Sequence, residues 1–188
     1  MQFNPLEISD VLLITPRKFC DARGYFMETF RDGLFEEMTG LDLAFVQDNH
    51  SHSIHANTVR GLHYQAPPHA QAKLVRCTAG AIIDVAVDVR PNSSTYGKSV
   101  QALLTAENAA QLFIPTGFLH GFATLAPNTQ VQYKCSDYYN GDCDGSVAWN
   151  DPYLNINWGL EHGFAPEKAV FSDKDKKAPK FTDWKSPF

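Results

Sequence analysis

Histidine side chains are concentrated in one part of this sequence. A neutral imidazole can accept a proton or bind a metal ion, and its charge changes near neutral pH. His50 and His52 would share one face of a β-strand and could form a metal-binding pair, but no carboxylate lies at a typical ligand spacing. Surface histidines are the favoured interpretation of that pair. Five of the seven histidines fall within twenty residues, namely His50, His52, His55, His63 and His69.

A second pattern surrounds His63, in the sequence RGLHYQ at residues 60–65. Arg60, His63 and Gln65 fall within one predicted strand, and Lys73 follows soon after. Regular alternation would place Arg60 and His63 on opposite faces, but Gly61 could host a bulge that turns one of them round. A structural histidine is the alternative for His63 taken alone.

Two further segments carry candidate groups. His120 lies in PTGFLHGF (115–122), where a Pro-x-Gly turn leads into a strand, and Tyr133 and Tyr139 would share a strand face with Val131, Cys135 and Asp137. Core aromatics with hydrated hydroxyls are the alternative for both tyrosines. Two strand-borne histidines beside a barrel mouth resemble a cupin. However, the sequence HYQAPPHAQAK (63–73) lacks the His-x-His pair and the Glu of metal cupins, so we expect no metal site.

The elements that must position these residues are mostly short strands separated by turn sequences. One helix is predicted at 31–40, with Leu34, Phe35 and Met38 on one face and Gly40 as its C-cap, and a second short helix near 151–158. This pattern predicts an all-β sandwich or barrel with few helices. The predicted strands are 11–14, 44–53, 58–65, 72–78, 81–89, 99–105, 109–115, 121–125 and 129–139.

The strand that ends at Ser53 has no clearly apolar face. Alternation divides it into Gln47, Asn49, Ser51 and Ser53 on one face and Asp48, His50 and His52 on the other. A solvated edge strand and a strand that lines a wet cavity are both compatible with this pattern.

Length and composition indicate one globular domain over residues 1–188, with 44% hydrophobic and 20% charged residues. The net charge of −5 argues against nucleic-acid or anionic-membrane partners. No apolar run is long enough to span a membrane, and no signal peptide is recognisable. Four scattered cysteines are typical of reduced thiols in a cytoplasmic protein.

Several of these segments together resemble the dTDP-4-dehydrorhamnose 3,5-epimerase family, over residues 19–179. The resemblance implies a cupin-like jelly roll that forms a homodimer and acts on a dTDP-4-keto-6-deoxyhexose without a cofactor or a catalytic metal. The implied reaction inverts C3 and C5 of dTDP-4-dehydro-6-deoxy-D-glucose to give dTDP-4-dehydro-L-rhamnose, a step of dTDP-rhamnose biosynthesis. The matching segments are DARGYFMETF, FVQDNHSHS, VRGLHYQ, AKLVRCTAGAIIDVAVDVR, QLFIPTGFLHGF, YK at 133–134, WNDP at 149–152 and SDKD at 172–175.

The resemblance also implies roles for individual residues. A C4 ketone acidifies the protons at C3 and C5, so inversion needs a base on one face, an acid on the other and a cation at the enolate oxygen. His63 resembles the base, Asp175 the carboxylate that pairs with it, Lys73 the cation and Tyr133 the acid.

Further positions resemble the family's substrate contacts. Arg23 and Glu28 match nucleotide contacts that an exchanged N-terminal segment of the partner subunit contributes. Asp144 lies where the family usually has Glu, so the carboxylate is kept but its side chain is shorter by one methylene group. The other matching positions are Gln47, Asn49, Arg60, His120, Tyr139 and Lys174.

Three alternatives remain open at this point. The chain could be an epimerase that inverts only C3 or only C5 of a related dTDP-4-keto-deoxysugar. It could be a sugar-nucleotide-binding jelly roll without catalysis, although every proposed catalytic position is kept. A metal-dependent cupin oxygenase is disfavoured because its ligands are missing.

Overall fold

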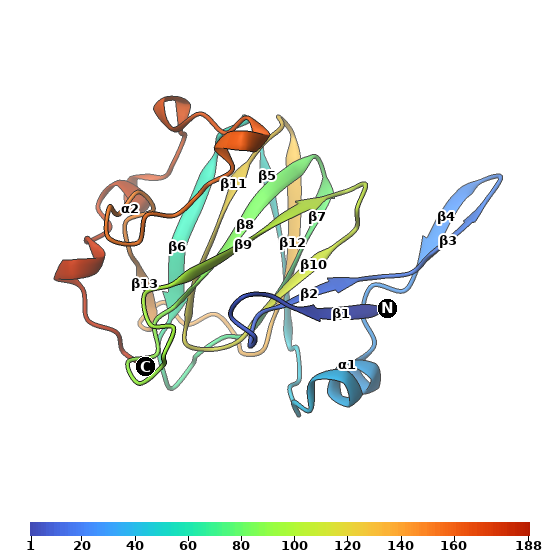
Figure 1. The fold of residues 1–188 in the computed structure, drawn as a ribbon, viewed down its shortest axis with the longest axis horizontal. Coiled ribbons are helices and arrows are strands. Elements are labelled where there is room, and N and C mark those ends of the chain that lie inside the picture. The colour runs from blue at the N-terminus through green and yellow to red at the C-terminus, as the bar shows by residue number, and fades with distance from the viewer.

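The computed structural model describes residues 1–188 and consists mainly of two antiparallel sheets that face each other (Figure 1). This is the cupin-like, all-β jelly roll that the sequence predicts. The six-stranded sheet has the order β1 (Gln2–Pro5), β2 (Leu12–Thr15), β10 (Gln111–Ile114), β7 (Lys73–Ala79), β12 (Thr129–Cys135) and β5 (Gln47–Ser53). The five-stranded sheet has the order β13 (Asp144–Ser146), β6 (Val59–Gln65), β11 (Phe118–Thr124), β8 (Ala81–Asp88) and β9 (Ser99–Thr105).

Three apolar clusters stabilise this arrangement. The largest lies between the sheets, where alternate side chains such as Val75, Ile82 and Leu112 are buried. A second cluster lies on the outer face of the five-stranded sheet, under the C-terminal segment. A third joins the outer face of the six-stranded sheet to α1 (Asp32–Thr39), around Phe35 and Phe113. The two sheets therefore have covered outer faces as well as a shared interior.

The C-terminal segment covers the five-stranded sheet with short helices rather than strands (Figure 1). The helix expected near 151–158 is absent, and that prediction was wrong. The Asp151 side chain accepts hydrogen bonds from the backbone N–H groups of Tyr153, Leu154 and Phe181, and Asn155 has a left-handed φ of 43°. The helices that do form are η1 (Leu160–His162), η2 (Pro166–Lys168), α2 (Asp173–Lys176) and η3 (Phe181–Asp183).

Other predicted elements agree with the structure except at their ends. The helix α1 ends as expected, because Gly40 is left-handed (φ 70°) and its N–H bonds to the Glu36 carbonyl. The strand predicted over 129–139 stops at Cys135. Asp137 and Tyr139 therefore lie outside the strand, and the prediction that they share its face was wrong. Four strands were not predicted from the sequence: β1, β13, β3 (Lys18–Asp21) and β4 (Gly24–Met27).

The hairpin formed by β3 and β4 projects away from both sheets (Figure 1). Three aromatic side chains on it are largely exposed: Phe19 at 51%, Tyr25 at 53% and Phe26 at 71%. Large exposed aromatics that lie together are typical of an interaction surface.

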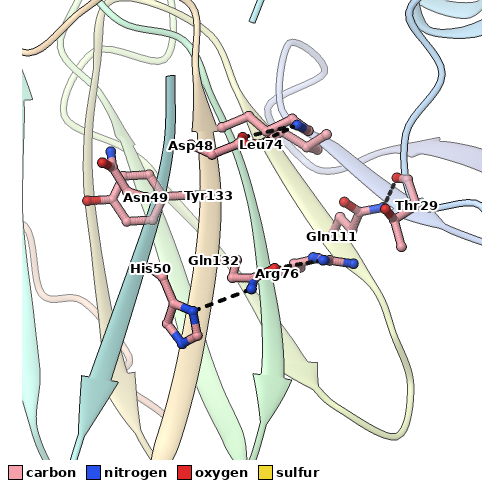
Figure 2. A pocket seen from close by; sticks show the side chains of 10 residues that line it. Thr29, Asp48, Asn49, His50, Leu74, Arg76, Gln111, Gln132 and Tyr133 are labelled. Atoms are coloured by element: carbon pink, nitrogen blue, oxygen red, sulfur yellow. Dashed lines mark hydrogen bonds and ion pairs between the residues drawn. The ribbon is translucent and has the colours of Figure 1, made fainter. Parts of the chain in front are cut away.

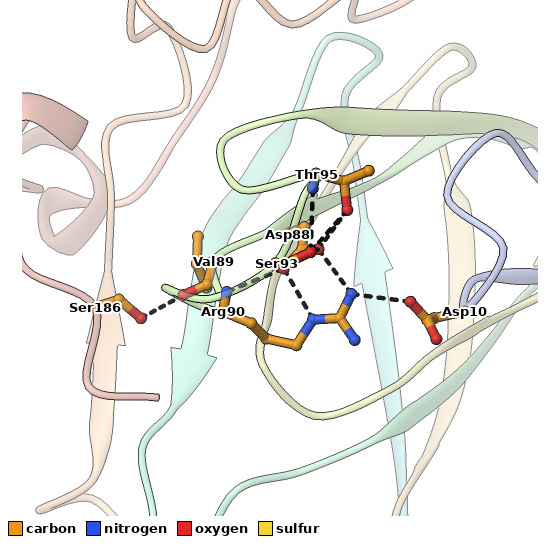
Figure 3. Close-up of polar contacts among 7 residues, drawn as sticks. All are labelled: Asp10, Asp88, Val89, Arg90, Ser93, Thr95 and Ser186. Carbon is orange, nitrogen blue, oxygen red and sulfur yellow. Dashed lines mark hydrogen bonds and ion pairs between the residues drawn. The ribbon is translucent and has the colours of Figure 1, made fainter.

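Hydrogen bonds around the β8–β9 connection organise that turn and reach both ends of the chain (Figure 3). Asp88 accepts hydrogen bonds from Arg90, Ser93 and Thr95, with its Oδ2 2.7 Å from Arg90 Nη2. Burial raises the pKa of Asp88, but these hydrogen bonds outweigh it and lower the pKa to about 2. The same guanidinium lies 2.9 Å from Asp10 Oδ2, and Ser186 donates to the Val89 carbonyl. These contacts join residues near both termini to the β8–β9 connection.

No helix of this fold has the length and apolar character needed to cross a membrane. All four cysteines are free.

Candidate active site

Two cavities, of about 410 Å³ and about 220 Å³, lie between the sheets and share His63, Lys73 and Tyr133. The larger cavity also contains Arg60, His120 and Asp175. The smaller cavity contains the other candidates: Gln47, Asn49, Tyr139, Asp144 and Lys174. The structure therefore gathers eleven of the thirteen candidate residues around one centre.

A bulge in β6 brings Arg60 and His63 to the same cavity, as the sequence predicts. In the pairing of β6 with β11, His63 lies opposite His120 and Arg60 lies opposite Phe122. Between these pairs β6 advances by three residues and β11 by two, so β6 has one extra residue, which is a β-bulge. Gly61 allows this close approach, because a Cβ atom there would lie 2.5 Å from Gly121 Cα.

The imidazole of His63 is oriented by a carboxylate from the C-terminal segment. Its Nε2 lies 2.6 Å from Asp175 Oδ1, and the Ser172 hydroxyl donates to Asp175 Oδ2 over 2.8 Å. Burial would raise the pKa of Asp175, but the hydrogen bonds from His63 and Ser172 outweigh it and hold the pKa below its usual value. The ionised carboxylate accepts the Nε2 proton, so Nδ1 is left free to take a proton from another molecule.

The opposite sheet supplies a phenol and an ammonium group. Tyr133 comes from β12 and Lys73 from the start of the neighbouring β7. Burial raises the pKa of Tyr133, which keeps the phenol protonated at neutral pH. Burial also lowers the pKa of Lys73, opposed by Cys135, Asp84 and Asp144.

A second histidine–carboxylate pair lies deeper between the sheets. His120 Nε2 lies 2.7 Å from Asp84 Oδ1, and Asp84 Oδ2 is buried without a hydrogen-bond partner. Burial lowers the pKa of His120 and raises that of Asp84. The sequence analysis missed Asp84. The signal was a single charged residue in the apolar run AIIDVAV (81–87), because a carboxylate buried in a strand requires a partner.

The polar face of β5 forms a wall of this site. The two faces divide as predicted: Gln47, Asn49, Ser51 and Ser53 point inward, and Asp48, His50 and His52 are exposed. Both interpretations of this strand hold, since β5 is at the edge of its sheet and also lines the cavities.

Polar groups from three segments, two of them charged, meet at the smaller cavity. Lys174 of α2 forms an ion pair with Asp144 of β13, and the Tyr139 hydroxyl lies 3.4 Å from Asp144 Oδ2. The guanidinium of Arg60 bonds to Ser53 Oγ and to the His52 carbonyl at the edge of the larger cavity.

Two candidate residues lie elsewhere. Arg23 is in the turn of the projecting hairpin, bonded to Asp21, and Glu28 follows β4 and bonds to Arg31. Neither residue lines the cavities of its own chain.

A further pocket of about 240 Å³ lies along the six-stranded sheet. Figure 2 shows Gln132, Arg76 and Gln111 in a row, with Asn49 and Tyr133 to one side. His50 bonds to Gln132 here and is exposed, as expected for a surface histidine. The structure has no group of three or more His, Cys, Asp or Glu side chains that could hold a metal ion.

Comparisons with known proteins identify the family of this chain. A family-wide sequence model described as dTDP-4-dehydrorhamnose 3,5-epimerase matches residues 5–183. A curated enzyme of that name from Sinorhizobium fredii is 50% identical over 179 residues, which covers 95% of this chain and 89% of the relative.

Solved structures give the same result. The crystal structure of dTDP-4-dehydrorhamnose 3,5-epimerase from Elizabethkingia anophelis matches with a TM-score of 0.91 and 44% identity, covering 97% of each chain. A 3,5-epimerase from Legionella pneumophila, in complex with dTDP-4-keto-L-rhamnose, matches with a TM-score of 0.90 and 39% identity over 96% of this chain and 93% of that one. The chain therefore belongs to the dTDP-4-dehydrorhamnose 3,5-epimerase family.

Proposed function

We propose that this protein inverts C3 and C5 of dTDP-4-dehydro-6-deoxy-D-glucose to give dTDP-4-dehydro-L-rhamnose, a step of dTDP-rhamnose biosynthesis. One observation carries the assignment of roles: His63 and Tyr133 extend from opposing sheets into the same two cavities. A sugar ring held between them would have a proton acceptor on one face and a proton donor on the other.

The reaction follows from this arrangement. Nδ1 of His63 takes the proton from C3 or C5, and the electron pair of the broken C–H bond moves into an enolate whose charge rests on O4. Tyr133 then gives its phenolic proton to the same carbon from the opposite face, which inverts the configuration. Proton exchange with solvent returns both residues to their starting states, and the same steps act on the second carbon.

Lys73 stabilises the intermediate in this scheme. An ammonium group beside the enolate oxygen lowers the energy of the developing charge, and one such donor typically contributes about 10²–10³-fold in rate. The reaction changes no oxidation state, so it needs no redox cofactor. We expect activity to survive dialysis against EDTA, and restoration of lost activity by added Zn²⁺, Mn²⁺ or Fe²⁺ would contradict a metal-free reaction.

Nucleotide binding is assigned to the smaller cavity and its rim. Gln47, Asn49 and Tyr139 are suited to the nucleoside, and the ammonium group of Lys174 is suited to the diphosphate. Arg60 and His120 line the larger cavity and are suited to the part of the diphosphate and sugar that lies there. Asp144 keeps the family's carboxylate and orients Lys174.

A homodimer with exchanged N-terminal segments would complete the site. Support comes from the projecting hairpin, whose large aromatics are exposed, whose turn carries Arg23 and whose second strand leads to Glu28. In this arrangement both residues reach the nucleotide of the neighbouring subunit. Light scattering combined with activity should show an active dimer, and a fully active monomer would exclude the composite site. The acidic net charge and the free cysteines favour a cytoplasmic enzyme without nucleic-acid or membrane partners.

Incubation with dTDP-4-dehydro-6-deoxy-D-glucose in D₂O tests the function directly. NMR should show deuterium at both C3 and C5 and inverted configuration at both carbons. Inversion at one carbon would instead identify a single-position epimerase. Absence of exchange in a protein that binds the nucleotide would identify a non-catalytic binding protein.

A further inference from the structure

The loop between β12 and β13, residues 136–143, carries Tyr139 but belongs to no strand. Its backbone is held by the side chains of three glutamines. Gln65 donates to the Tyr138 carbonyl over 2.9 Å and accepts from the Asn140 N–H over 2.9 Å. Gln71 donates to the Asp137 carbonyl over 2.8 Å, and Gln47 accepts from the Tyr139 N–H over 2.9 Å. We refer to Gln47, Gln65 and Gln71 as the glutamine clasp.

Gln65 is the central member of the clasp. Its side chain is buried, with the residue only 5% exposed. Besides the two bonds to the loop it donates to the His69 carbonyl, so both amide hydrogens and the amide oxygen are used. It lies at the end of β6, two residues after His63. Gln65 therefore connects the strand of the proposed base to the loop of Tyr139.

The loop presents groups to the smaller cavity. The Tyr139 side chain is largely exposed, and its hydroxyl lies 3.4 Å from Asp144, which pairs with Lys174. A ring on an unsupported loop would have to be ordered by the ligand, and that ordering reduces affinity. A loop that is already fixed by hydrogen bonds within the protein avoids this cost.

We propose that Gln65 is a positioning residue for nucleotide recognition: through the glutamine clasp it holds Tyr139 and Asp144 at the cavity in the geometry that the dTDP moiety requires. This inference rests on the proposed function. An amide is needed because the position must donate to two carbonyls and accept from one N–H. Glutamate would place its charge against both carbonyls, and methionine would fill the space but remove the partners of the Tyr138 carbonyl and the Asn140 N–H.

The first test compares wild-type protein with Gln65→Met. The dissociation constant for dTDP is measured by calorimetry, KM and kcat by epimerisation, and the opening of residues 136–143 by hydrogen exchange. We expect the dTDP dissociation constant and KM to rise about 10-fold, with kcat within about 3-fold of wild type, and faster exchange confined to the loop. An unchanged dissociation constant despite faster loop exchange would overturn the inference. A loss of kcat at unchanged KM would also overturn it, because Gln65 would then act through His63.

Two further variants complete the design. Gln71→Met removes a single bond to the loop and should shift dTDP affinity in the same direction by about 2–3-fold, so it tests the clasp if Gln65→Met fails to fold. Because Gln65 and Gln71 also line the smaller cavity, weaker binding without faster exchange of residues 136–143 would identify a direct contact with dTDP and overturn the inference. The matched control is Gln130→Met, since Gln130 bonds to His50 outside the cavities and should leave both affinity and loop exchange unchanged. Wild-type turnover in D₂O is scored separately. If wild-type protein binds dTDP but does not turn over the substrate, the epimerase assignment fails. The dTDP dissociation constants of the variants then test by themselves whether Gln65 positions the loop for nucleotide binding. If wild-type protein does not bind dTDP, both fail.

Discussion

Two histidine–aspartate pairs lie in this barrel with nearly the same geometry and different surroundings. His63 Nε2 is 2.6 Å from Asp175, and His120 Nε2 is 2.7 Å from Asp84. The second oxygen of Asp175 accepts from Ser172, whereas the second oxygen of Asp84 has no partner. The side chain of His63 is 32% exposed, and that of His120 is 8% exposed.

This difference separates two functions of the same pair of residue types. Hydrogen bonds keep the pKa of Asp175 below its usual value, so an ionised carboxylate supports an accessible imidazole that can gain a proton. Around Asp84 burial dominates, raising its pKa and lowering that of His120, so a proton arriving on His120 is disfavoured. His63 is therefore suited to accept a proton from the substrate, whereas His120 is suited to bind the substrate as a neutral imidazole.

The largest expected effect is that of His63→Ala. Because it removes the proposed proton acceptor, exchange and inversion should both fall by about 10²–10⁴-fold, measured by NMR in D₂O. His120→Ala should act mainly on KM. If His63→Ala exchanges protons at a near-normal rate, the base lies elsewhere and His120 becomes the next candidate.

Replacing the two aspartates should sharpen the contrast. Asp175→Asn keeps the His63 imidazole but removes the charge that orients it, so exchange should fall by less than about 10²-fold, a milder loss than for His63→Ala. Asp84→Asn keeps a carbonyl oxygen for His120 and should cost less activity. Equal losses in both variants would mean that the two pairs share the chemistry.

Ser172→Ala tests the support beneath Asp175. The hydroxyl donates to Asp175 Oδ2 and caps α2 through the Asp175 N–H, so its removal should cost about 1 kcal/mol of stability and a few-fold in exchange rate. Thermal unfolding and the D₂O assay measure the two effects. A variant with wild-type Tm and rate would show that Asp175 needs no second partner.

Acid titration of thermal stability gives the smallest effect, with opposite signs at the two pairs. The lowered pKa of Asp175 stabilises the fold above its unfolded pKa, and this stability is lost as pH falls through the lower folded value. The Tm advantage of wild type over Asp175→Asn should therefore shrink below about pH 4.

The sign is opposite at Asp84. Because its pKa is raised in the folded protein, stability falls as pH rises above about 3.9. The Tm of Asp84→Asn should therefore increase relative to that of wild type as pH rises above about 3.9. Differences of about 2–4 °C per kcal/mol are expected at this chain length.

The sequence predicted the barrel well because strand alternation and turn residues are local signals. For the same reason it divided the two faces of β5 correctly and marked Gly61 as a position that could host a bulge. It failed where tertiary contacts decide. Asp151 begins a single turn and also binds the distant Phe181 N–H, but the turn stops at the left-handed Asn155. Beyond Cys135 the chain of β12 continues as a loop whose backbone bonds to the glutamine clasp. Asp175 could be placed beside His63 only through family resemblance, since 112 residues separate them.

The most direct measurement of the central claim is deuterium incorporation by Tyr133→Phe. This substitution keeps the ring and its packing but removes the proposed donor on the second face. We expect the variant to bind dTDP and to incorporate deuterium with retained configuration, because His63 can return a deuteron to the face it came from, while epimerised sugar is scarce. Full epimerisation by Tyr133→Phe would contradict the two-sided mechanism and make Tyr133 a core aromatic. Loss of exchange together with inversion, in a folded variant that still binds dTDP, would contradict it as well, because the hydroxyl would then act before reprotonation.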